Sequence, residues 1–147
     1  MKKLVAVPAL AIAASLAVAA LAFGARASSV SVSAKLTAKQ EVPAQVVKNQ
    51  SAHGSFEATL SGTHLAWTLT FAKLTGPATA AHIHLGGMGK AGNVVVPLCT
   101  PCKSPMKGTA TISASLLKTI KKHGTYVNVH TAKNPNGEIR GQLVAKS

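Results

Sequence analysis

The chain has 147 residues, a length typical of one domain, and its 16 Lys and Arg against three acidic residues give a formal net charge of +13. Three carboxylates, on Glu41, Glu57 and Glu138, leave little room for a two-carboxylate hydrolase or an oxygen-rich calcium site. Two cysteines cannot make a cysteine-rich zinc module. The 47% hydrophobic content excludes a disordered polycation, and 3% aromatic residues argue against a stacking platform for single-stranded nucleic acid.

The first 27 residues have the pattern of a secretory signal peptide. A basic start precedes an apolar run over residues 4–23, and an Ala-Arg-Ala site follows at 25–27. We expect cleavage after Ala27, which removes three basic residues and lowers the formal charge to +10. An uncleaved anchor is the alternative, because the run is long enough to span a bilayer. The predicted domain is therefore residues 28–147, secreted or periplasmic, with no transmembrane segment after signal removal.

Alternating apolar and polar residues predict a chain made mostly of short strands. The period of two is clearest over 30–39, and it recurs in 56–60 and 65–71, which a turn at Ser61–Gly62 joins into a hairpin. Residues 100–107 are expected to be irregular, and 44–53 show no clear pattern. Further strands are expected at 81–85, 94–96, 108–112, 126–131 and 139–145.

One short helix is expected at residues 113–122. Ser113 suits an N-cap, Leu116, Leu117 and Ile120 share one face, and Gly124 ends the pattern. Seven or eight strands separated by turns predict an all-β fold. The expected architecture is an antiparallel sandwich, Greek-key or immunoglobulin-like, with the helix as a connection, and a barrel is the alternative.

Three histidines form a candidate metal site. His82 and His84 lie two residues apart on a predicted strand, so their side chains point to the same face. His130 lies on a later predicted strand, and it completes a three-imidazole site only if the two strands are neighbours. Imidazole suits copper or zinc. The alternative interpretation is that these histidines bond across the sheet or lie at a solvated rim. The remaining three histidines are expected at the surface, and they are His53, His64 and His123.

Cys99 and Cys102 form a second candidate constellation. Their CxxC spacing also occurs in redox motifs, but Lys103–Ser104–Pro105 is a poor start for the helix that such motifs require. We expect a disulfide that closes a small loop in an exported protein. A redox pair, or a soft-metal site that includes Met106, is the alternative.

The positive charge and the missing motifs restrict the partners. Lysines are spread along the chain and are densest at Lys118, Lys121 and Lys122, without a nucleic-acid motif, so no nucleic-acid partner is expected. The charge is interpreted as a solvated face, and the functional alternative is adhesion to an anionic cell-envelope polymer or surface protein. No nucleophile motif or phosphate loop is present, so a binding or interaction module is favoured over an enzyme, and enzymatic activity is left open.

Four segments in this order resemble the CHRD domain, the module named after chordin. They are Gln40–Pro43, Ala81–His84, Tyr126–Thr131 and Asn136–Leu143, and the resemblance spans roughly residues 30–146. The resemblance implies an all-β Greek-key or immunoglobulin-like sandwich and implies little about activity.

The histidine pattern also resembles the copper half of copper/zinc superoxide dismutases. An H-x-H strand and a later strand histidine match His82, His84 and His130, and Arg140 is similar in placement to the anion-guiding arginine. The loop 86–98 contains no His or Asp, so it departs from the family's zinc site.

Three functions follow as hypotheses. The first is a binding module that holds copper or another late transition metal through the three histidines, with Met88 approaching from the glycine-rich loop. The second is an interaction module in which Asn128, Glu138 and Arg140 form buried polar links. The third is a copper-dependent redox enzyme of dismutase type.

Overall fold

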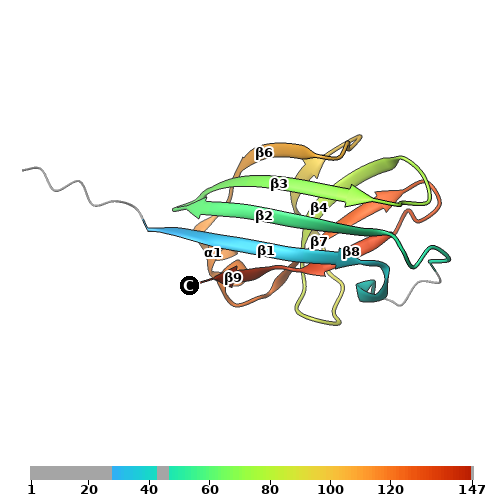
Figure 1. Cartoon of the computed structure of the whole chain (residues 1–147). Helices are drawn as coiled ribbons and strands as arrows, with labels where there is room; N and C mark the ends of the chain where they lie inside the picture. The colour runs from blue at the N-terminus through green and yellow to red at the C-terminus, as the bar shows by residue number, and fades with distance from the viewer. Residues whose placement is uncertain (1–27, 43–46, 147) are drawn as a thin grey trace, which may run out of the picture.

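The computed structural model describes residues 28–42 and 47–146, and these residues form nine antiparallel strands and one α-helix (Figure 1). The expected signal peptide lies outside the described residues. The elements in chain order are β1 Ser29–Thr37, the 3₁₀ helix η1 Ala38–Gln40, β2 His53–Ser61, β3 His64–Ala72, β4 Ala78–Leu85, β5 Val94–Cys99, β6 Met106–Thr111, α1 Ala114–Lys121, β7 Thr125–Thr131, β8 Ile139–Gln142 and β9 Val144–Lys146.

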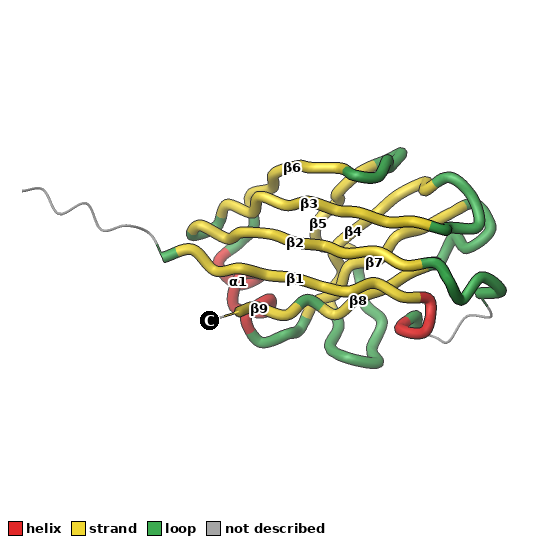
Figure 2. The backbone as a smooth tube through the Cα atoms, in the orientation of Figure 1, coloured by secondary structure: helices red, strands yellow, loops and turns green. Residues whose placement is uncertain are grey.

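The strands form one continuous sheet that folds over into two layers. Their order is β5–β4–β7–β8–β1–β2–β3–β6, and β9 pairs with β1. Figures 1 and 2 show β1, β2, β3 and β6 as one layer with β4, β5 and β7 behind it. The chain passes between the layers at the β3–β4 and β5–β6 connections and again through α1 (Figure 2). The prediction of an antiparallel Greek-key sandwich with one short connecting helix is confirmed.

The hydrophobic core lies between the two layers. Leu36, Phe56 and Leu69 face inward from the first layer, and Ile83 and Val127 face inward from the second. All five are fully buried. A side chain of this size contributes roughly 1.5–3 kcal/mol when it leaves water. The alternation that buries Ile83 turns its two histidine neighbours to the opposite, outer face of β4.

The strand pattern is confirmed, and the differences lie at its ends. The expected first strand stops at Thr37, because the Glu41 amide donates to Ala38 O and closes the 3₁₀ turn. The irregular segment expected up to residue 107 already becomes strand at Met106. The expected last strand divides at Leu143, whose amide bonds Thr125 O, so β9 leaves β8 and pairs with β1.

Helix α1 begins as predicted. The Ser113 hydroxyl accepts a hydrogen bond from the Leu116 amide at 3.1 Å and so caps the first turn. Ile120 is fully buried, while Lys118 and Lys121 are exposed in the last turn, where their charge opposes the negative end of the helix dipole. Among the described residues, no helix is long and apolar enough to cross a membrane.

Candidate metal centre

Strands β4 and β7 pair directly and bring the three predicted histidines together. In the register, Ala80 lies opposite His130, His82 opposite Asn128 and His84 opposite Tyr126. His130 is therefore diagonal to His82, and all three imidazoles stand on the outer face. The spacing in the sequence could not show whether the two histidine strands are neighbours, and in the structure they are.

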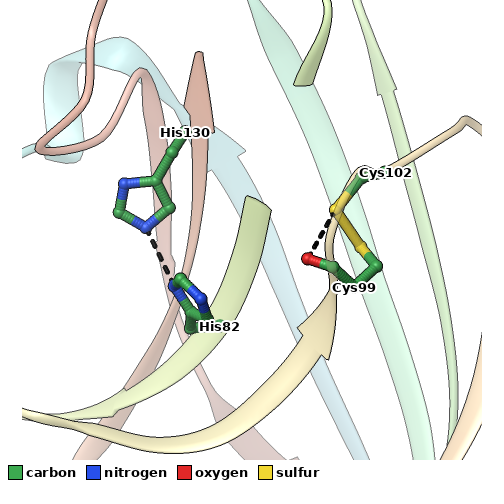
Figure 3. The surroundings of a disulfide bond; sticks show 4 residues. All are labelled: His82, Cys99, Cys102 and His130. Carbon is green, nitrogen blue, oxygen red and sulfur yellow. Dashed lines mark hydrogen bonds between the residues drawn. A yellow bond between two sulfur atoms is a disulfide. The ribbon is translucent and has the colours of Figure 1, made fainter. Parts of the chain in front are cut away.

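The three rings converge. The Nδ1 atom of His82 lies 3.2 Å from Nε2 of His130, as the dashed line in Figure 3 marks. The ring centroid of His84 lies 5.6 Å from that of His82 and 6.0 Å from that of His130. One nitrogen from each ring lies within 4.8 Å of the other two. Two nitrogens about 2.1 Å from the same ion are at most about 4.2 Å apart, so a shared ion requires only small side-chain shifts.

Backbone carbonyls orient two of the rings. The Nδ1 atom of His84 lies 3.0 Å from Gly92 O, and the Nδ1 atom of His130 lies 3.0 Å from Pro135 O. A carbonyl can only accept, so both Nδ1 atoms carry the proton and both Nε2 atoms are unprotonated. The Nε2 lone pair of His130 accepts from His82 Nδ1. The Nε2 atom of His84 is buried and has no hydrogen-bond partner. This arrangement is the one that metal-binding imidazoles use, with one nitrogen tied to a carbonyl and the other free.

Burial keeps the cluster uncharged. Burial lowers the pKa of His82, and the neighbouring His84 lowers it further. Burial also lowers the pKa of His84 and the charge of Arg140 acts in the same direction, although the hydrogen bond to Gly92 O acts to raise it. Burial lowers the pKa of His130 to about 4, although its bond to Pro135 O acts in the opposite direction. The imidazoles are therefore neutral near pH 7, the form in which they bind metal ions.

The glycine-rich loop 86–93 covers one side of the cluster. Tyr126 stacks against His84 with ring centroids 4.9 Å apart, and its hydroxyl lies 3.3 Å from the Gly92 amide. The guanidinium of Arg140 lies over the Tyr126 ring at 3.5 Å. Because β7 lies between β4 and β8, Tyr126 stands between His84 and Arg140. This stack holds the loop that supplies the carbonyl partner of His84.

The predicted polar residues lie on the same face but bond in separate groups. Asn128 donates from Nδ2 to both carboxylate oxygens of Glu41, at 2.9 and 3.0 Å. Arg140 donates to Gly87 O and Lys90 O, at 3.2 and 2.8 Å. Glu138 bonds to neither of the other two. Asn128, Glu138 and Arg140 are thus buried, as hypothesised, and each serves a different partner set.

Glu138 is a buried carboxylate surrounded by donors. It accepts from the amide and hydroxyl of Thr75, the hydroxyl of Thr131 and the side-chain amide of Asn134. Burial acts to raise its pKa, but these hydrogen bonds outweigh burial and the pKa is lowered. The ionised carboxylate fixes the β7–β8 turn, which carries the Pro135 carbonyl that orients His130.

Glu41 was not predicted to be part of this face. It is 5% exposed, and burial raises its pKa to about 7 although Asn128 and Arg140 act to lower it. In the sequence it stands out only within a family motif. The signal that was available is the scarcity of acidic residues, since Glu41 and Glu138 are two of only three in the chain.

The other predicted residues lie outside the histidine cluster. His53, His64 and His123 are exposed, as expected. Met88 is 85% exposed and lines a recess beside Glu41 and Arg140.

The disulfide is present: Cys99 and Cys102 are joined with an S–S distance of 2.07 Å, and the bond lies apart from the histidine pair in Figure 3. It closes the loop after β5, and the Cys102 amide ties this loop to Ala78 O on β4.

The comparisons agree with the fold and the motifs. The family model of the CHRD domain matches residues 32–143, and the chain belongs to this family. No curated protein gives a significant match. No solved structure does so either.

Proposed function

We propose that this CHRD domain is an extracytoplasmic binding module for a late transition metal ion, copper in the first instance, held by His82, His84 and His130. The observation that carries the proposal is the pair of carbonyl-fixed tautomers in a half-buried cluster: the Nε2 atom of His84 has no partner among the described residues, and that of His130 presents its lone pair to His82. A cluster that served only the sheet would leave no buried imidazole nitrogen unpartnered, because such a group costs about 1–3 kcal/mol.

The donor set favours copper and zinc over harder ions. Neutral imidazole binds both metals, and among divalent first-row ions copper binds a given nitrogen site most tightly. Three protein ligands also leave a coordination position open for a further ligand. The disulfide fits an oxidising compartment outside the cytoplasm, in agreement with the expected signal peptide.

The proposal is tested by calorimetric titration of the metal-free protein with Cu(II) and Zn(II). We expect one-to-one binding, and a loss of at least about 100-fold in affinity in each of His82→Ala, His84→Ala and His130→Ala. His64→Ala is the matched control, because His64 is exposed on β3. Equal affinity in wild type and the three cluster variants would contradict the proposal, as would an equal loss in the control.

A second candidate function is adhesion to an anionic polymer of the cell envelope. It is favoured by the distribution of charge, since two of the three acidic side chains, Glu41 and Glu138, are buried while the lysines of α1 are exposed. The surface charge is therefore more one-sided than the composition suggests. Salt-dependent binding to a polyanion that falls in the Lys118→Gln/Lys121→Gln/Lys122→Gln variant would support adhesion. Unchanged binding in this variant would refute a role for α1.

A further inference from the structure

A small recess of about 250 Å³ lies between loop 86–93 and the segment that follows β1, and none of the three clustered histidines lines it. Its walls include Met88 and Gly89 from the loop and Gln142 from β8. Two groups of opposite charge, the Arg140 guanidinium and the Glu41 carboxyl, line the same recess. The metal site uses neither group.

Arg140 presents a free hydrogen-bond donor. The residue is 2% exposed, and its Nη2 atom is bound to the carbonyls of Gly87 and Lys90. Its Nη1 atom is buried and has no hydrogen-bond partner in the part of the chain that the structure describes. The Tyr126 ring at 3.5 Å holds the guanidinium in place, so it cannot turn away to find water elsewhere. A buried cation with an unused donor is a site for a ligand with an acceptor, and a carboxylate is the commonest match.

Glu41 presents free acceptors. Among the described residues its two oxygens share one donor, the Nδ2 atom of Asn128, and a carboxylate can accept about four hydrogen bonds. The Oδ1 atom of Asn128 is also buried without a partner, and Asn128 lies directly opposite Arg140 in the β7–β8 register. Within the described part of the chain, no ion pair joins Glu41 to Arg140. Both groups thus line the same recess and do not neutralise each other by contact.

We propose that this recess binds a free α-amino acid, with the ligand carboxylate on the Arg140 guanidinium and the ligand ammonium on the ionised Glu41 carboxylate. An inorganic anion would bind Arg140 but would be repelled by the Glu41 carboxylate. A simple amine would bind Glu41 but would be repelled by the Arg140 guanidinium. A zwitterion satisfies both. The recess volume suits a ligand of a few heavy atoms, for which a Kd of about 1 mM is expected.

The test uses the metal-free protein at pH 8, above the Glu41 pKa of about 7, so that the carboxylate is ionised. Three probes, glycine, acetate and methylammonium, are added, and binding is followed by shifts of the Gly89 amide and the Arg140 Nε–H in nitrogen–proton NMR spectra. Glycine should bind at least tenfold more tightly than either half-ligand. Glu41→Gln keeps the shape of the side chain and should reduce this preference to less than threefold. Glu57→Gln is the matched control on the exposed face of β2 and should leave it unchanged.

Two further results separate this site from the metal centre. Glycine binding should persist in His130→Ala, which removes a proposed metal ligand and leaves the recess intact. Loss of glycine binding in that variant would overturn the proposal, because the amino acid would then depend on the histidine cluster. Absence of shifts with glycine at about 50 mM, well above the expected Kd, would also overturn it and would assign the free donors to water.

Discussion

The Nδ1 atom of His82 and the Nε2 atom of His130 lie 3.2 Å apart across strands β4 and β7. The Nδ1–H group of His130 donates a hydrogen bond to Pro135 O, so the Nε2 atom of this neutral ring carries no proton and must accept. His82 must therefore donate from Nδ1. The hydrogen bond therefore occupies the two nitrogens that lie closest together in the cluster. A metal ion shared by these two atoms would replace this bond.

The first prediction concerns the tautomer of His82. In the metal-free protein, His82 should carry its proton on Nδ1. His84 and His130 are also protonated on Nδ1, because the carbonyls of Gly92 and Pro135 fix them in this form. If the metal binds His82 through Nδ1, the proton moves to Nε2 on metal addition. Long-range nitrogen–proton NMR of the imidazoles distinguishes the two forms. An Nε2-protonated His82 in the metal-free protein would contradict the assigned bond.

The second prediction concerns Gly137, where the β7–β8 turn meets the polar face. Its φ is +132°, and an added Cβ would lie 2.5 Å from the Asn128 side chain and 2.7 Å from Glu41 Oε2. Gly137→Ala should therefore lower the free energy of unfolding by about 2–4 kcal/mol, from backbone strain and steric overlap together. Urea unfolding measures this loss.

Gly62→Ala is the control for that substitution. Gly62 also has a positive φ, +59°, but no atom lies within 4 Å of the position that an added methyl group would take. The variant should lose only about 1 kcal/mol, from strain alone. Equal losses in the two variants would show that the close approach at Gly137 has no energetic consequence.

The third prediction is a pH dependence of stability that comes from Glu41. Its pKa in the folded protein is about 7, above the ordinary value of 4.5, so the folded state holds an extra proton between these values. Stability from this group is complete below about pH 4.5 and falls as the pH rises to about 7, by about 3 kcal/mol in total. The lowered pKa of His130 acts in the opposite direction, with stability lost as the pH falls from 6.5 to about 4.

Glu41→Gln isolates this contribution. The histidines are the same in both proteins, so the wild-type minus variant difference in unfolding free energy should decrease steadily between pH 4.5 and 7. Urea titrations at several pH values give the difference. A difference that stays constant, or increases with pH, would show that the buried carboxyl is not protonated in the folded state.

The sequence predicted the strands well and the contacts between them poorly. The alternation around Ile83 was enough to place His82 and His84 on one outer face. The contact with His130 depends on β4 pairing with β7, which the chain reaches only after β5, β6 and α1. Short-range patterns carry no information about such a pairing. Glu41 was not predicted for the same reason, because its hydrogen-bond partner Asn128 lies 87 residues further along the chain.

The fourth prediction concerns the Cys99–Cys102 disulfide. It closes a very short loop, so removing it should cost only about 2 kcal/mol in the chain-entropy description. The Cys99→Ser/Cys102→Ser variant should unfold at lower urea concentration and retain the metal affinity of the wild type, because the histidines and their carbonyl partners lie on other segments. A matching loss of metal affinity would show that the β5–β6 loop supports the cluster.

The most direct test of the metal centre is the position of the ion itself. Anomalous scattering at the copper edge, from crystals of the copper-loaded protein, should give one strong peak about 2.0–2.2 Å from a nitrogen of each of His82, His84 and His130. A peak bound instead at the exposed His53, His64 or His123, or no peak at the cluster after loading, would contradict the account.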